Sequence, residues 1–179
     1  MAAAAEILAT GSDASMSEVA AAAGMARATV YRYFPTRKAL LDRVAEVAAA
    51  DVGARLNDAR LDSVSADEAV VRAVRAFFDV RHYFAVLARG RVAADDAPRE
   101  SLIEEPLRQM FARGQKNGEF RSDLPVEWLA AGLVDIVASV VSTLPARGRD
   151  DTVDLVSGLF LDGVRARQAT RADLSPKPS

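Results

Sequence analysis

The chain has 179 residues, a formal net charge of −2 at pH 7 and no cysteine. This length allows one or two small domains with a hydrophobic core, and half of the residues are hydrophobic without forming a run long enough to span a bilayer. The missing cysteines exclude disulfides, thiolate nucleophiles and cysteine metal sites, and the slightly negative net charge argues against indiscriminate coating of nucleic acid while allowing a local basic surface.

The amino terminus is rich in alanine and has no basic residue before Arg27. A secretory signal would begin with a positively charged segment, so we expect a cytoplasmic protein. Residues 2–10 are expected to form a short helix, and residues 11–14 the turn after it.

Residues 15–35 predict two short helices joined by a tight turn. Ser15 can cap the first helix, and Glu18, three residues later, can complete a capping box. Gly24 stands where a helix end needs a left-handed residue. The second helix is expected from about Ala26 to Phe34, because Pro35 disfavours helical backbone in the residue before it.

The second helix has two different faces. Val30 and Phe34, four residues apart, are expected to pack inward with Ala26. The outward face carries Arg27, Ala28, Tyr31 and Arg32, flanked by Thr29 and Tyr33. Arginine can read guanine edges in the DNA major groove, and hydroxyl groups can contact phosphates. The charges alone would fit an ordinary solvated surface helix, but together with the capping box, the turn glycine and the terminating proline they favour a DNA-binding helix.

The segment EVAAAAGMARATVYRYFPTRKALL, residues 18–41, resembles the helix-turn-helix of the TetR family of bacterial transcriptional regulators. The Ala-Gly turn and the Tyr-x-x-Phe-Pro-x-(Lys/Arg)-x-x-Leu ending carry the resemblance. It implies DNA contacts from residues in and around the two helices: Ser15, Ser17, Arg27, Ala28, Thr29, Tyr31, Arg32, Tyr33 and Arg37. Two positions depart from the family pattern. Where this chain has Ala26, members of the family often have a serine or threonine that caps the helix, and where it has Ala28 they often have glycine.

The rest of the chain predicts further helices. Thr36 can cap a connecting helix that runs toward Leu56, and a break is expected from Arg60 to Ala66. Later helices are expected at 67–92 with a break near Arg81, and at 98–117, 126–144 and 151–167. The predicted fold is therefore all-α with about nine helices: a three-helix DNA-binding domain (1–46), a ligand-binding and dimerisation domain (47–172) and a flexible tail (173–179).

The last two helices are apolar on more than one side, so each needs a second partner besides its own core. Burial within one chain is the simpler alternative, but a two-fold dimer also doubles the contact of a single short recognition helix with DNA. The resemblance places the family's dimer interface on the same helices. We expect the interface to include Leu129, Gly132, Leu133, Ile136, Val140, Leu155, Leu159, Phe160 and Gly163.

The middle helices supply large apolar side chains that could line a small-molecule pocket. For any single residue, core packing is the better explanation. The resemblance implies an inducer site in this region, which we expect among Phe77, Phe78, His82, Phe84, Met110, Phe111 and Trp128.

The function predicted from the sequence is a TetR-like regulator, by default a repressor. It would bind palindromic operator DNA as a homodimer and release it on binding a small-molecule effector. An enzyme is not expected, because the paired acidic residues are sequence neighbours that do not face one another on a helix. Neither a cofactor nor a metal is expected, since there is one histidine and no cysteine. The alternative is a helical dimer that binds a small molecule or protein and has lost specific DNA binding, which the uncapped Ala26 keeps open.

Overall fold

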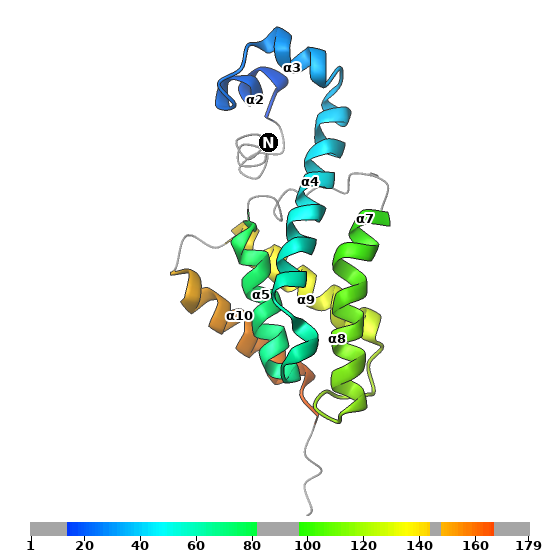
Figure 1. Ribbon diagram of the computed structural model, residues 1–179. Helices are drawn as coiled ribbons and strands as arrows, with labels where there is room; N and C mark the ends of the chain where they lie inside the picture. The colour runs from blue at the N-terminus through cyan, green and yellow to red at the C-terminus, as the bar shows by residue number, and fades with distance from the viewer. Residues whose placement is uncertain (1–13, 82–96, 144–147, 167–179) are drawn as a thin grey trace, which may run out of the picture.

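The computed structural model describes residues 14–81, 97–143 and 148–166, and most of these residues are helical (Figure 1). The bounds are α2 Met16–Ala22, α3 Arg27–Tyr33, α4 Arg37–Asp58, η1 Leu61–Ser63, α5 Ala66–Asp79, α7 Ala97–Arg99, η2 Glu100–Glu104, α8 Glu105–Lys116, α9 Val126–Thr143 and α10 Arg149–Val164. In this part of the chain the β structure is limited to one isolated bridge between Phe120 and Arg165. The all-α class is confirmed.

The number of helices differs from the prediction. With α7, η2 and α8 taken as one continuous helical stretch, the described residues contain seven helices, not about nine. The helix expected at 2–10 and the second half of the one expected at 67–92 lie outside the described residues.

The local signals at the amino-terminal helices act as the sequence predicts. The Ser15 amide donates to Glu18 Oε2 at 2.7 Å, and the Glu18 amide donates to Ser15 Oγ at 3.2 Å, which completes the capping box. Gly24 has φ +64°, a left-handed conformation that glycine adopts without strain. Helix α3 ends at Tyr33, two residues before Pro35, and the Thr36 hydroxyl caps α4 by accepting from the Ala39 amide.

Helix α4 joins two separate hydrophobic cores. The smaller core holds Met16, Val19, Ala20, Val30, Leu40 and Val44, and the larger core begins on the same helix at Ala49. One stripe of α4 residues, spaced four apart, is buried through both: Leu40, Val44, Ala48, Val52 and Leu56. A single uninterrupted helix therefore connects α2 and α3 with the carboxy-terminal bundle (Figure 1).

The predicted break after α4 is confirmed. Arg60 adopts a left-handed φ of 47°, and the 3₁₀ turn η1 follows it. Ser65 then caps α5, because its hydroxyl accepts from the Glu68 amide. The chain thus reverses direction, and α5 packs back along α4.

The helix predicted at 98–117 is present but contains a π-helical turn, η2, that periodicity did not indicate. Pro106 explains it: proline has no amide hydrogen for the carbonyl of Leu102, and its ring would clash with that carbonyl in a regular α-helix. The Glu105 amide accordingly donates to the Glu100 carbonyl, five residues back. The helix is therefore widened where it passes α4.

The two last helices close the bundle. The β-branched run at residues 136–141 lies within α9 and is helical, as expected. The turn after α8 fixes the end of α10: the Arg121 amide donates to the Val164 carbonyl at 2.9 Å, and the Ala166 amide to the Glu119 carbonyl at 3.0 Å. Helix α10 ends at Val164, three residues earlier than predicted.

Candidate functional site

Helices α2 and α3 form a helix-turn-helix unit whose inner surface is small and apolar. Val19 and Ala20 of α2 and Val30 of α3 are buried together, and Phe34 packs on them partly exposed. Ala26, predicted to pack inward, is exposed and stands at the amino-terminal end of α3, where no side chain caps the helix. Because one face of α3 packs against α2, its opposite face is exposed among the described residues.

That outer face of α3 presents two arginine–tyrosine pairs to solvent. Tyr31 is 39% exposed and Tyr33 is 63% exposed. The Arg27 guanidinium lies 5.3 Å from the centre of the Tyr31 ring, and that of Arg32 lies 5.2 Å from the centre of the Tyr33 ring. Within the described residues neither arginine forms a salt bridge. Both positive charges are therefore available to an anionic partner, with aromatic rings beside them.

The other residues expected to contact DNA are in varied surroundings. Ser17 and Ala28 are exposed, and Thr29 is half-buried. The Ser15 hydroxyl is engaged in the capping box. The Arg37 guanidinium donates to the Ala14 carbonyl, so that it joins the start of α4 to the start of α2. Both Ser15 and Arg37 thus make contacts that stabilise the fold. The sequence pattern predicted the contact of Ser15 but not that of Arg37.

The remaining cations near α3 are paired. Lys38 forms a salt bridge with Asp42 at 2.7 Å, and Arg43 one with Glu46 at 2.8 Å. Their charges are partly neutralised within α4. The unpaired positive charge of the region is therefore concentrated on α3 at Arg27 and Arg32.

The residues expected at a dimer interface divide into two groups. Leu129, Leu133 and Phe160 are buried within the chain, and Gly132 is half-buried near Phe160, where a Cβ would make an ordinary contact at 3.9 Å. Ile136 and Val140 are half-buried.

Helix α10 also has an apolar outer stripe. Leu155 is 54% exposed and Leu159 is 66% exposed, and a side chain added at Gly158 or Gly163 would meet no atom within 4 Å. Large exposed leucines in succession on one helix are unusual for a surface that faces only water.

The residues expected around an inducer pocket have different surroundings. Phe77, Phe78 and Phe111 are buried in the main core, and Phe111 packs against the rings of Phe120 and Phe160 at 5.5 and 5.7 Å. Trp128 is 69% exposed at the start of α9. His82 and Phe84 lie outside the described residues.

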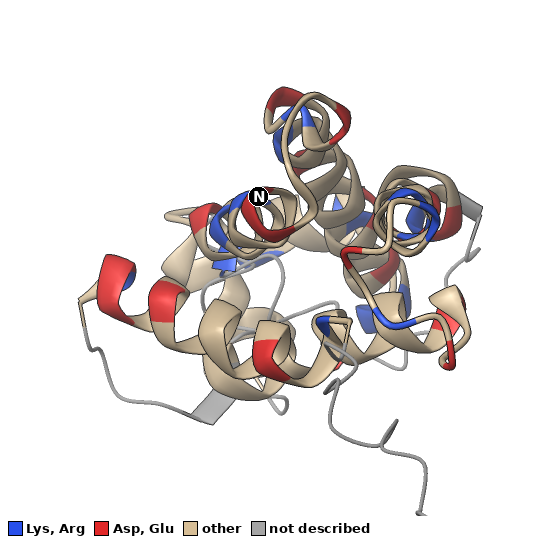
Figure 2. Ribbon diagram, turned by 90° about the horizontal axis from the view of Figure 1, so that it is seen from below, with Lys and Arg blue, Asp and Glu red and all other residues tan. Residues whose placement is uncertain are grey.

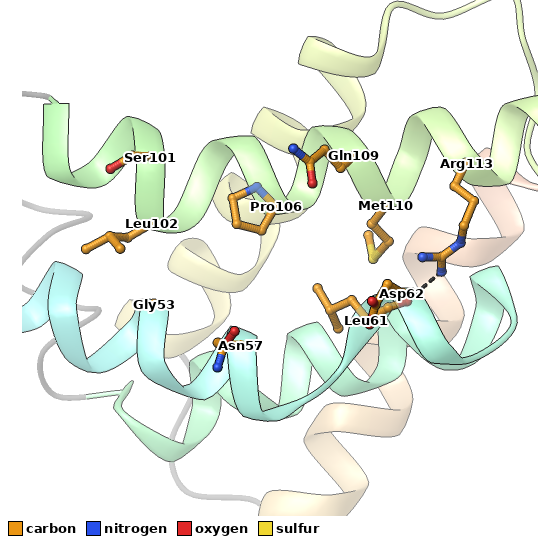
Figure 3. A pocket seen from close by; sticks show the side chains of 10 residues that line it. All are labelled: Gly53, Asn57, Leu61, Asp62, Ser101, Leu102, Pro106, Gln109, Met110 and Arg113. Carbon is orange, nitrogen blue, oxygen red and sulfur yellow. Dashed lines mark hydrogen bonds between the residues drawn. The ribbon is translucent and has the colours of Figure 1, made fainter.

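A cavity of about 550 Å³ lies between α4, η1 and the η2–α8 stretch (Figure 3). Met110 is the member of the expected set that lines it, together with residues that the sequence did not single out, among them Gly53, Asp62 and Arg113. A proline inside a predicted helix, Pro106, is the sequence signal that could have drawn attention to this place.

Acidic and basic residues both occur on several helices of the bundle (Figure 2). On η2 and α8, Arg108 pairs with Glu100, Glu104 and Glu105. Partial burial and a hydrogen bond with Glu100 raise the pKa of Glu104, whereas the hydrogen bond from Arg108 lowers the pKa of Glu100. This cluster is satisfied internally and joins successive turns of one helical stretch.

Two further features, a metal site and a membrane-spanning helix, are absent from the described residues. No three histidine, cysteine, aspartate or glutamate side chains of those ranges converge in a way that could hold a metal ion. Nor does any helix there have the length and apolar character needed to cross a membrane.

Comparison with known proteins agrees with this geometry. Residues 1–44 match the sequence model of bacterial regulatory proteins, tetR family. A TetR transcriptional regulator of Streptomyces coelicolor, SCO0520, is 26% identical with a TM-score of 0.61 over 93% of this chain and 97% of that one. A tetR family regulatory protein of Rhodococcus RHA1 is 18% identical with a TM-score of 0.72 over 93% and 95%, and PfmR of Thermus thermophilus is 21% identical with a TM-score of 0.66 over 90% and 96%. No curated protein matches the chain.

Proposed function

We propose that the chain is a TetR-type transcriptional regulator that binds operator DNA as a homodimer and releases it in response to a small molecule. The match of residues 1–44 to the tetR family model and the likeness of the fold to solved TetR regulators support this proposal. The outer face of α3 is the observation that carries this proposal. It holds two arginines without a salt bridge among the described residues, each beside an exposed tyrosine. Arginine donates two parallel hydrogen bonds to guanine, and a tyrosine hydroxyl can donate to phosphate.

A dimer is part of the proposal because α3 has only seven residues. One such helix reaches a few base pairs, whereas two related by a two-fold axis read a palindrome. The exposed leucines of α10, with the neighbouring surface of α9, supply an apolar face for a second copy.

The proposed control of DNA binding is geometric. Two recognition helices must be roughly 34–36 Å apart to enter successive major grooves. Only three residues separate α3 from α4, and α4 contributes buried residues to both cores, so a tilt of α4 moves α3. A ligand that favours an unsuitable spacing would remove one half-site contact and with it the gain from bivalent binding.

A second candidate remains: a helical dimer that binds a small molecule or protein without reading DNA. The structure supplies one observation in its favour, since α3 has no side-chain cap at Ala26 and its first turn is less stable for that reason.

Selection of bound duplexes from a random pool by the purified full chain separates the two candidates. The proposal predicts an enriched palindrome whose affinity falls steeply with salt, because arginine contacts to phosphate release counterions. A pool that shows no enrichment would favour the second candidate.

A further inference from the structure

The cavity between α4 and the η2–α8 stretch has the form of a groove with an apolar floor. The two helical stretches run side by side, and η1 closes one end (Figure 3). Its apolar lining comes from Gly53, Leu61, Leu102, Pro106 and Met110. At about 550 Å³ the groove falls within the range of small-molecule sites.

Two residues shape this groove. Pro106 forces the π turn η2, which displaces the backbone of the stretch beside α4. At Gly53 the two stretches nearly touch: a Cβ built there would lie 2.8 Å from Leu102 Cβ and 3.3 Å from the Leu102 carbonyl oxygen. The glycine permits this close approach at one end, and the groove continues from it toward η1 (Figure 3).

One acidic and one basic residue line the groove at the η1 end. Figure 3 shows Asp62 and Arg113 there. Arg113 Nη2 donates to the carbonyl oxygens of Leu61 and Val64, the latter at 3.2 Å, and these bonds hold the guanidinium in place. Within the described residues no salt bridge involves either Asp62 or Arg113. The groove therefore offers a fixed donor and an exposed acceptor whose formal charges cancel.

We propose that this groove binds an uncharged amphiphile, with an apolar body along Leu102, Pro106 and Met110 and a head group that both donates and accepts hydrogen bonds. A primary carboxamide fits, because its carbonyl can accept from Arg113 while its amide hydrogens donate to Asp62. A carboxylate would meet repulsion from Asp62, and an ammonium repulsion from Arg113.

The same groove is suited to the effector, an assignment that rests on the function proposed above. One of its walls is the carboxy-terminal half of α4, the helix that positions α3, and the other wall is the η2–α8 stretch. A molecule held between them contacts α4 directly. It can therefore bind one tilt of α4 better than another, which is the condition for a ligand to shift a conformational equilibrium.

A matched series of eight-carbon probes tests the proposal on the full chain: octanamide, octanoate and octylammonium, titrated by calorimetry. Octanamide should bind saturably and about tenfold more tightly than either charged probe, a ratio equal to about 1.4 kcal/mol. Asn57→Trp, at an exposed lining position of α4, should abolish this binding because the indole fills the groove.

Asp62→Asn tests the charge argument. Removing the carboxylate leaves Arg113 unopposed, so octanoate should gain about tenfold relative to octanamide. Asp58→Asn, at an exposed acidic residue that does not line the groove, is the matched control and should leave the ranking unchanged. Octanamide that binds no better than octanoate, or that still binds Asn57→Trp, would overturn the proposal.

Measuring duplex binding in the same preparations keeps this inference apart from the proposed function. If the ranking of the probes fails while the chain binds a selected palindrome, the groove is wrongly assigned and the function stands. If the ranking holds while no duplex is enriched, the groove is correctly assigned and DNA control is wrong.

Discussion

The outer faces of α3 and α10 both carry large side chains that are exposed among the described residues, but their chemistry differs. On α3 the exposed groups are arginines and tyrosines, with no acidic residue from Arg27 to Tyr33. On α10 they are Leu155 and Leu159, with aspartates beside them and glycines open to solvent. A positive, hydrogen-bonding face suits a polyanion, whereas an apolar face needs another apolar face. The difference is the basis of the proposal that α3 binds DNA and that α10 binds a second copy of the chain, which would let two α3 helices act together.

Breaking the α10 face should have the largest effect on DNA binding. We expect Leu159→Asp to produce a monomer. The interface would bury the new carboxylate away from water, and the two-fold axis would place the same negative charge of the second copy near it. Affinity for a selected palindrome should fall by about 100-fold or more, since bivalent binding is lost. Sedimentation and fluorescence anisotropy measure the two effects.

Ala112→Asp is the control for this change, because it adds the same charge at an exposed position of α8. It should leave the oligomeric state unaltered. A Leu159→Asp protein that remains dimeric would show that the partner of this face is not a second copy.

Breaking the α3 face should have the next largest effect. Arg27→Ala should weaken binding to the palindrome by about 10- to 100-fold, the range for one arginine that contacts a base, and should leave the dimer intact. Arg55→Ala removes an equally exposed arginine from the far half of α4 and should change affinity little. Equal losses from both variants, in anisotropy at fixed salt, would mean that α3 has no special part in binding.

A smaller effect is expected on stability, where Ser15 and Ser17 should differ. Ser15→Ala should reduce the free energy of unfolding by about 1 kcal/mol, because the first turn of α2 loses its cap. Ser17→Ala, two residues later and exposed, should have almost no effect on urea unfolding. Indistinguishable midpoints would contradict the capping account.

The smallest expected effect is a pH dependence of the same cap. The Ser15 amide and hydroxyl lower the pKa of Glu18, so the folded state favours its ionised carboxylate. A lowered folded-state pKa contributes stability that is present above the ordinary value and is lost as the pH falls through the folded value. The stability difference between the wild type and Glu18→Gln should therefore shrink on going from pH 7 to pH 3. A difference that stays constant over this range would contradict the effect.

Local chemistry made much of the amino-terminal half predictable. Ser15, Gly24, Pro35 and Thr36 each fix one helix end through a hydrogen bond or a backbone conformation within three residues, so their roles can be read from the sequence. The contact of Arg37 with the Ala14 carbonyl joins residues 23 apart, and no local pattern signals it.

The groove could not be predicted for the same reason. It depends on Gly53 and Leu102, which are far apart in sequence, and on a π turn whose cause is a single proline. The helical periodicity that placed Phe77 and Phe111 inward was sound. It could not tell a filled core from a lined cavity, because both put large apolar side chains on the inner face of a helix.

The central claim is that two copies of α3 read DNA together, and a hydroxyl-radical footprint of the full-length protein on its selected duplex tests it most directly. The account predicts two protected patches on one face of the helix, about 10–10.5 base pairs apart, both weakened by Arg27→Ala. A single patch, or protection that Arg27→Ala leaves unchanged, would contradict it.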